Sequence, residues 1–182
     1  MKFTELKING LVLAEPVVHG DKRGYFLENY RESLWAEQIE TVNFVQENES
    51  LSSKGVFRGF HYQVGDFCQG KLVRVIQGSV TDYVVDLRQS SLTFGKMISV
   101  ELSGENKKMV YVPRGCAHAF FTLQEQTIFQ YKVTAYYNKS SERGFRPDSP
   151  EIIKAFPELE TKLQLSEKDR ELLFYKDAEL FP

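Results

Sequence analysis

The stretch QGKLVRVIQGSVTDYVVDL, residues 69–87, contains two strand-like runs joined by a tight turn. Lys71–Gln77 and Val80–Leu87 are rich in β-branched residues, which suit extended backbone. Between them, Gly78-Ser79 is a pair typical of a short hairpin turn. We therefore predict a β-hairpin here, the local unit of an antiparallel sheet.

Working outward from this hairpin, similar short runs follow one another along most of the chain. They are expected at Val12–Val18, Thr41–Gln46, Val56–Gln63, Lys96–Leu102, Met109–Val112, Ala117–Leu123 and Thr127–Ala135. Many short strands separated by turn signals favour an antiparallel sandwich or closed barrel over alternating βα units. Two short helices are the exceptions, one over Arg31–Gln38 and one whose N-cap is Ser166, with Asp169 at the third helical position.

The composition describes an ordinary globular protein, and we expect one domain over residues 1–182. A net charge of -2 without any basic run gives no reason to expect a nucleic-acid partner. No apolar run approaches the length that crosses a bilayer, and the N-terminus lacks the apolar core of a signal peptide. Cys68 and Cys116 could form one bridge at most, so a reducing cytoplasm is the simplest interpretation.

The alternation of side chains along two strands places polar groups beside apolar ones. Lys71 shares a strand face with Val73 and Val75, and Tyr131 shares one with its apolar neighbours two residues away. If these faces point into the barrel, a lysine and a tyrosine lie among apolar walls, where a lysine is costly without a partner or a task. The alternative is that Lys71 sits at a strand end and extends its ammonium into solvent.

Three histidines are available for acid–base chemistry. His19 stands in a polar turn, whereas His118 follows a Pro-Arg-Gly-Cys-Ala turn and leads into an apolar run. His61 lies in an aromatic-rich strand, with Arg58 and Gln63 close by and Lys71 on the next strand. A hydrogen-bonded structural role is the default for a single histidine in a strand. Because imidazole titrates near neutral pH, His61 also suits the role of general base.

A metal site is the competing interpretation of the histidines. The segment PRGCAH, residues 113–118, resembles the second motif of the cupin superfamily. Metal-binding cupins usually present two histidines one residue apart and then a glutamate, whereas here Gln63 stands two residues after His61. Two scattered histidines with no neighbouring carboxylate make a poor divalent site, so we expect no metal.

Eight motifs together resemble one enzyme family. They are HGDKRGYFLE (19–28), VQENES (45–50), GVFRGFHYQ (55–63), QGKLVRVIQGSVTDYVVDL (69–87), YVPRGCAHAFF (111–121), YKVTAYY (131–137), SERG (141–144) and LSEKD (165–169). In this order they are similar to the dTDP-4-dehydrorhamnose 3,5-epimerase family over nearly the whole chain. The resemblance implies a cupin-type jelly roll, usually a homodimer, that uses no metal or organic cofactor. It also implies conversion of dTDP-4-dehydro-6-deoxy-D-glucose to dTDP-4-dehydro-L-rhamnose.

The resemblance assigns roles that the reaction needs. A ketone at C4 acidifies the protons on C3 and C5, so the enzyme needs a base, a group that stabilises the enolate and a proton donor on the opposite ring face. By resemblance these are His61, Lys71 and Tyr131, with Asp169 fixing the tautomer of His61 and favouring its protonated form. Without the family match, Asp169 could merely cap a helix.

The family's substrate-contacting positions carry over in the same way. The matching residues are Arg23, Glu28, Gln46, Asn48, Arg58, His118, Glu142 and Lys168, and Tyr137 is expected to help shape the pocket. The basic members suit diphosphate and sugar oxygens. For Arg23 and Glu28, an ordinary ion pair between a turn and a strand is the alternative.

The sequence departs from the family pattern near the proposed base. Phe60 stands where leucine is common, VGDFC (64–68) replaces a stretch that usually contains proline, and the segments 145–148 and 156–157 replace versions that contain tryptophan. Relatives that epimerise only C3 or only C5, and ketoisomerases on related nucleotide sugars, share the same core residues. A metal-dependent cupin oxygenase and a non-catalytic sugar-binding cupin are the more distant alternatives.

Overall fold

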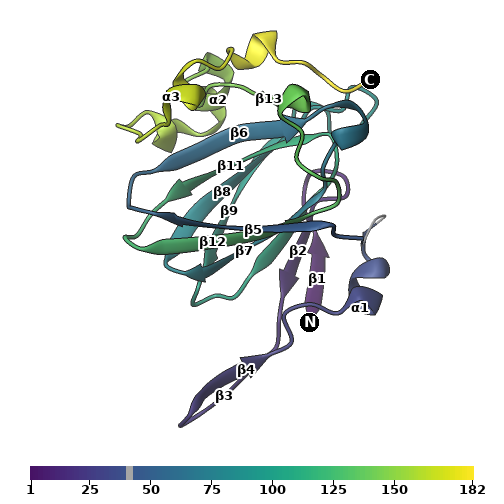
Figure 1. Ribbon diagram of the computed structural model, residues 1–182, viewed down its shortest axis with the longest axis vertical. Coiled ribbons are helices and arrows are strands. Elements are labelled where there is room, and N and C mark those ends of the chain that lie inside the picture. The colour runs from purple at the N-terminus through teal and green to yellow at the C-terminus, as the bar shows by residue number, and fades with distance from the viewer. Residues whose placement is uncertain (40–42) are drawn as a thin grey trace.

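The computed structural model describes residues 1–39 and 43–182, which form two antiparallel sheets packed face to face (Figure 1). The first sheet has the order β1 (Lys2–Glu5), β2 (Val12–Glu15), β10 (Met109–Val112), β7 (Lys71–Gln77), β12 (Thr127–Val133) and β5 (Gln46–Ser52). The second has the order β13 (Glu142–Gly144), β6 (Phe57–Gln63), β11 (Cys116–Thr122), β8 (Ser79–Asp86) and β9 (Met97–Ser103). The expected all-β jelly roll is confirmed.

A short two-stranded hairpin stands apart from both sheets. It consists of β3 (Val18–Asp21) and β4 (Gly24–Leu27), and it projects away from the body of the molecule (Figure 1). Tyr25 and Phe26, in its second strand, are 58% and 70% exposed, which is unusual for large apolar side chains in a folded chain.

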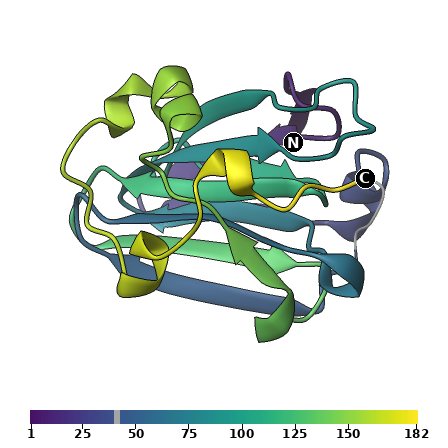
Figure 2. The ribbon, with the colours of Figure 1, turned by 90° about the horizontal axis from the view of Figure 1, so that it is seen from above.

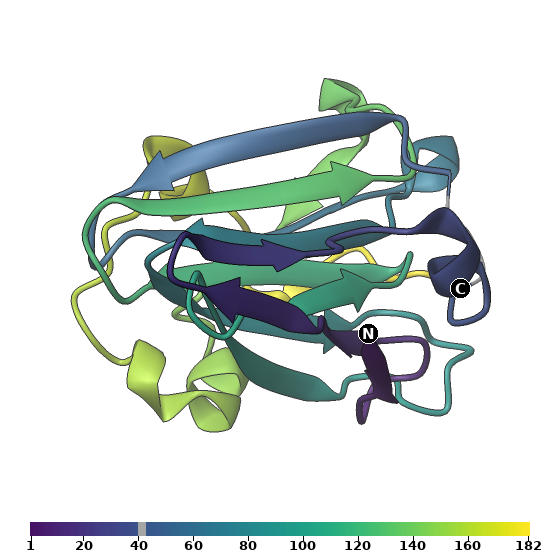
Figure 3. The same ribbon diagram turned by 90° about the horizontal axis from the view of Figure 1, so that it is seen from below.

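Three apolar clusters hold the molecule together. The central cluster lies between the sheets and includes Val73 and Phe129 from the first sheet and Val84 and Phe120 from the second. A second cluster covers the outer face of the second sheet with the C-terminal segments, which lie across it when the molecule is seen from above (Figure 2). A third packs the fully buried Trp35 against the first sheet. Figure 3 shows the ribbon of this sheet from below.

The helices are short and lie at the periphery. They are α1 (Glu32–Ala36), α2 (Pro150–Ala155) and α3 (Glu167–Arg170), with 3-10 turns η1 (Gly65–Phe67), η2 (Lys139–Ser141), η3 (Pro157–Leu159) and η4 (Tyr175–Asp177). As expected, Ser166 caps α3, because its hydroxyl accepts from the backbone N–H of Asp169 at 3.1 Å. In the described ranges, none of these helices is long and apolar enough to cross a membrane.

The hairpin prediction is confirmed, whereas two other strands differ from expectation. The run Val12–Val18 divides between β2 and β3. The strand expected over 41–46 is wrong, because β5 begins at Gln46; Thr41 and Val42 lie outside the described residues. The reason is that alternate residues of β5 are polar and line pockets, so the strand lacks the apolar face by which strands are recognised.

A β-bulge explains why the alternation of β6 is irregular. Opposite β11, His61 pairs with His118 and Arg58 pairs with Phe120, so β6 contains one extra residue. The extra residue falls at Gly59, whose φ of +127° suits glycine and whose added Cβ would lie 2.4 Å from the Cβ of Ala119. The bulge brings Arg58 and His61, three residues apart, to the same cavity.

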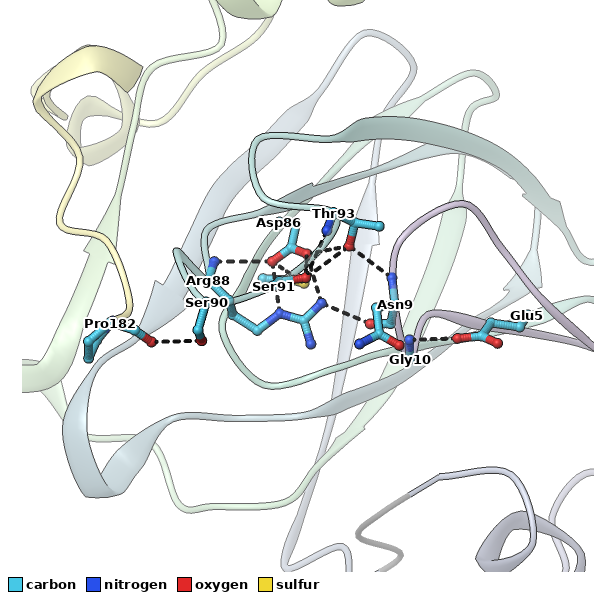
Figure 4. A network of polar contacts seen from close by, with 10 residues as sticks. Glu5, Asn9, Gly10, Asp86, Arg88, Ser90, Ser91, Thr93 and Pro182 are labelled. Atoms are coloured by element: carbon cyan, nitrogen blue, oxygen red, sulfur yellow. Dashed lines mark hydrogen bonds and ion pairs between the residues drawn. The ribbon is translucent and has the colours of Figure 1, made fainter.

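A buried carboxylate ties together distant parts of the chain at one end of the sandwich (Figure 4). Asp86, which is 0% exposed, accepts hydrogen bonds from Arg88, Ser91 and Thr93 in the loop after β8. Arg88 and Thr93 also bond to Asn9, so the network joins the N-terminal turn to this loop. Its saturation with partners identifies Asp86 as a structural carboxylate.

Candidate active site

A cavity of about 550 Å³ opens between the two sheets. Its walls come from β5, β6, β7, β11, β12 and the segment 164–169 before and within α3. A second pocket of about 310 Å³ adjoins it, and both pockets are lined by His61, Lys71 and Tyr131. These three predicted catalytic side chains therefore stand where the two spaces meet.

His61 hydrogen-bonds to the carboxylate of Asp169, as expected. Its Nε2 lies 2.6 Å from Oδ1 of Asp169, and the two side chains are 30% and 5% exposed. Desolvation raises the pKa of Asp169, but hydrogen bonds from His61 and Ser166 and the charges of His61 and Lys168 outweigh it, so the pKa is lowered. Ser166 caps the helix, while the Asp169 side chain turns to the histidine.

A second histidine–carboxylate pair lies directly across the β6–β11 ladder. His118 Nε2 is 2.7 Å from Oδ2 of Asp82, and the side chains are 7% and 1% exposed. Here desolvation raises the pKa of Asp82 despite the opposing influence of His118 and Lys71. The other oxygen of Asp82 has no hydrogen-bond partner among the described residues.

Of the two directions that the strand alternation left open, Lys71 takes the inward one and does not extend into solvent. The residue is 9% exposed, and its ammonium donates to the backbone carbonyl of His61 at 3.3 Å. Burial lowers its pKa to about 8, although the negative charges of Asp82 and Glu142 act in the opposite direction. Lys71 is thus a buried cation next to the candidate base.

Tyr131 comes from β12 in the first sheet, whereas His61 comes from β6 in the second. The two side chains therefore approach the cavity from opposite sheets. Desolvation raises the pKa of Tyr131, and the charge of Arg58 and a hydrogen bond from Asn48 partly oppose that rise. This arrangement can present a base and an acid to the two faces of one ring.

The structure brings most of the expected substrate-binding residues to the two pockets. His118, Arg58 and Lys168 line the first; Gln46, Asn48, Tyr137 and Glu142 line the second. Glu142 connects the two groups, because it pairs with Lys168 at 2.5 Å and accepts from the Tyr137 hydroxyl at 2.8 Å.

Two expected residues lie elsewhere. Arg23 is on the projecting hairpin, where its guanidinium pairs with Asp21 at 2.6 Å. Glu28 pairs with Arg31 at 2.5 Å. Within one copy of the chain, neither lines the two pockets; each forms an ordinary ion pair with a residue nearby in the sequence, and they do not pair with each other.

Sequence reasoning missed Asp82 and the pocket-lining Ser50. Asp82 sits two residues from Val80 and from Val84, both fully buried in the central cluster, so strand alternation could have identified a carboxylate facing inward. Ser50 carried no comparable signal, because β5 is polar on both faces. The hydroxyl oxygen of Ser50 is buried and lacks a partner within the described residues.

Neither His61 nor His118 lies in a group of side chains that could together bind a metal ion. Across residues 1–39 and 43–182, no three His, Cys, Asp or Glu side chains gather as a metal site would require. His61 and His118 instead each direct one ring nitrogen to a single carboxylate.

Comparisons with known proteins identify one enzyme family. The family model described as dTDP-4-dehydrorhamnose 3,5-epimerase matches residues 5–177. A curated relative of that name from Pseudomonas aeruginosa is 44% identical over 183 residues, covering 100% of both chains. A crystal structure of that name from Elizabethkingia anophelis has a TM-score of 0.90 and 43% identity, covering 97% of each chain. A 3,5-epimerase from Legionella pneumophila in complex with dTDP-4-keto-L-rhamnose has a TM-score of 0.90 and 39% identity, covering 98% of this chain and 94% of its own.

Proposed function

Because this chain belongs to the dTDP-4-dehydrorhamnose 3,5-epimerase family, we propose a division of labour among its own residues for the family's reaction. The enzyme inverts C3 and C5 of dTDP-4-dehydro-6-deoxy-D-glucose and yields dTDP-4-dehydro-L-rhamnose. Each inversion removes a proton from a carbon next to the C4 ketone and returns a proton from the other face of the ring.

His61 is the base. Its Nε2 is engaged with Asp169, so Nδ1 is the nitrogen left to accept the substrate's proton. Nε2–H donation to the carboxylate selects the tautomer with a free lone pair on Nδ1. Once the imidazole gains a proton, the negative charge of Asp169 stabilises the imidazolium.

Lys71 stabilises the enolate that each proton removal creates. The ammonium is nearly enclosed, and a charge interacts more strongly in such a site than in water. A preorganised cation of this kind favours the charged intermediate over the neutral ketone, which is the requirement for catalysis.

Tyr131 returns the proton on the opposite face. Its phenol reaches the cavity from the sheet that faces His61, and a phenol is a competent acid for a strongly basic enolate carbon. Arg58 and Lys168 supply positive charge for the diphosphate. Tyr137 and Glu142 line the space next to the sugar site, where the nucleoside would lie.

The enzyme forms a homodimer in which the projecting hairpin packs against the second copy. Val18, Tyr25 and Phe26 are too exposed on a free hairpin to be without a partner surface. Arg23, on the same hairpin, would then be available to the partner's substrate, as would Glu28 just after it. The chain is a single domain and works in the cytoplasm.

The observation that carries this proposal is that His61 and Tyr131 enter one cavity from opposite sheets, with the buried Lys71 next to the base. The test is incubation with dTDP-4-dehydro-6-deoxyglucose in deuterated water without added metal. Deuterium should enter both C3 and C5. Entry at one carbon would assign a mono-epimerase, and no exchange with substrate confirmed bound would refute the mechanism.

A further inference from the structure

A chain of hydrogen bonds runs along the polar face of β5 to Asn48, which lies opposite Tyr131. The backbone N–H of Tyr137 donates to Oε1 of Gln46 at 3.1 Å. Nε2 of Gln46 donates to Oδ1 of Asn48 at 2.9 Å. Asn48 is the direct partner of Tyr131 across the β5–β12 ladder, and both side chains line the second pocket.

The direction of this chain is determined at its first link. A backbone N–H can only donate, so the atom of Gln46 that meets it must be the carbonyl oxygen. The Gln46 amide nitrogen is then the atom that faces Asn48, and it requires the oxygen of Asn48 as its acceptor. The Asn48 amide nitrogen is consequently the atom left for Tyr131.

We propose that Gln46 and Asn48 are positioning residues that improve Tyr131 as a proton donor, because the oriented Asn48 amide donates to the tyrosine oxygen and stabilises the phenolate left behind. This inference rests on the proposed role of Tyr131. It differs from the substrate-binding role that the family resemblance implies for the same two residues.

The surroundings of Tyr131 explain why such help is needed. Desolvation disfavours the phenolate and so raises the pKa of the phenol, whereas the charge of Arg58 and the Asn48 hydrogen bond counteract this. A phenolate formed in a partly apolar pocket, packed against Phe129, is costly without a donor on its oxygen. Hydrogen bonds to charged groups are among the stronger ones in proteins.

The test measures how removed protons are returned. In deuterated water, a weakened Tyr131 lets His61 return deuterium to the same face, so exchange occurs without inversion. The ratio of inverted product to total exchange therefore reports on Tyr131, and it does not depend on the fraction of enzyme that is folded. The KM of the substrate reports separately on binding.

Four variants separate the possibilities. Asn48→Leu removes the amide that would donate to Tyr131. In Gln46→Glu a carboxylate oxygen faces Asn48, so the Asn48 amide nitrogen turns to this oxygen and its carbonyl oxygen turns to Tyr131. Both should lower the ratio about tenfold or more. Gln46→Leu adds no charge and leaves the Asn48 amide free to take either orientation, so we expect the ratio to fall about threefold. Glu47→Gln, on the outward face of the same strand, where Glu47 pairs with Lys132, should leave the ratio unchanged.

The outcomes distinguish this inference from the proposed function. A raised KM with an unchanged ratio in Asn48→Leu and Gln46→Glu would make these residues substrate ligands and overturn the inference. If the ratio fell in Gln46→Glu but not in Gln46→Leu, the added negative charge would explain the fall, and the inference would again be overturned. If Tyr131→Phe itself inverts as the wild type does, the role of Tyr131 in the proposed function also fails.

Discussion

Two histidine–carboxylate pairs lie side by side in this protein, and they differ in almost everything except their geometry. The His61–Asp169 and His118–Asp82 contacts measure 2.6 and 2.7 Å, and the two histidines are cross-strand neighbours. His61 is 30% exposed toward the cavity, whereas His118 is 7% exposed. The pKa of Asp169 is lowered, and that of Asp82 is raised. The contact distance alone therefore does not distinguish the two pairs.

The difference follows from the number of partners around each carboxylate. Asp169 lies in the first turn of the short helix α3 at the edge of the cavity, where His61, Ser166 and Lys168 all favour its charged form. Asp82 lies within the buried strand β8, where the charges of His118 and Lys71 and a hydrogen bond from His118 oppose the effect of desolvation. The first environment suits repeated proton transfer, and the second suits a fixed arrangement.

The largest expected effect is that of His61→Asn. Asparagine can still bond to Asp169 but cannot accept a proton, so deuterium exchange should fall by roughly a thousandfold, within the range for a lost general base. In the His118–Asp82 pair, His118→Asn should lower deuterium exchange only about tenfold, as expected for a lost polar contact. Equal losses in the two variants, measured by exchange at C3 and C5, would erase the distinction between the pairs.

Asp169→Asn should have the next largest effect. An amide at this position can donate to Nε2 and stabilise the tautomer whose proton sits on Nδ1, which is the wrong tautomer for a base. We expect kcat to fall on the order of a hundredfold with little change in KM. A variant as active as the wild type in steady-state assays would mean that Asp169 only anchors α3.

Lys71 contacts His61 and is influenced by the charge of Asp82, so the alkaline pH dependence of kcat should report on both pairs. The pKa of Lys71 is lowered to about 8, so the rate should decline as the pH rises through that value and the ammonium is lost. Asp82 raises the pKa of Lys71, and Asp82→Asn should therefore move this decline to lower pH by a few tenths of a unit or more. Lys71→Arg should remove the decline, because guanidinium stays protonated. An identical alkaline limb in wild type and Asp82→Asn would contradict this coupling.

The smallest effect concerns stability in acid, where the two carboxylates should act with opposite sign. The lowered pKa of Asp169 means that its contribution to stability is present above the ordinary aspartate value near 4 and is lost as the pH falls through the lowered pKa. The raised pKa of Asp82 means that its contribution is present below that ordinary value and is lost as the pH rises through the raised pKa.

Urea unfolding of wild type, Asp169→Asn and Asp82→Asn between pH 3 and about 6 would compare these slopes. Relative to wild type, Asp169→Asn should lose less stability on acidification, and Asp82→Asn should lose more. Parallel curves for all three proteins would show that the two carboxylates have the same pKa in the folded and unfolded chain.

Much of the site was predictable from residue alternation and from the motifs. A period of two placed Lys71 on the face of Val73 and Val75, and Tyr131 on the face of its apolar neighbours, although it left open whether the Lys71 ammonium reached solvent. His61 could not be oriented in this way, because the bulge at Gly59 changes the alternation between Arg58 and His61. β5 was misplaced for a related reason, since strand recognition depends on an apolar face that a pocket-lining strand does not have.

The sequence by itself determined the hairpin at 71–86, the all-β class and the family, because these depend on local propensity and on motifs in a given order. The family resemblance also paired Asp169 with His61, whereas only the tertiary structure revealed that Asp82 pairs with His118. Asp169 follows His61 by 108 residues, and Asp82 precedes His118 by 36, so no local pattern relates them. Only the tertiary structure also decided the charge preference of each carboxylate, because desolvation and neighbouring charges arise when the sheets and the C-terminal segment pack together.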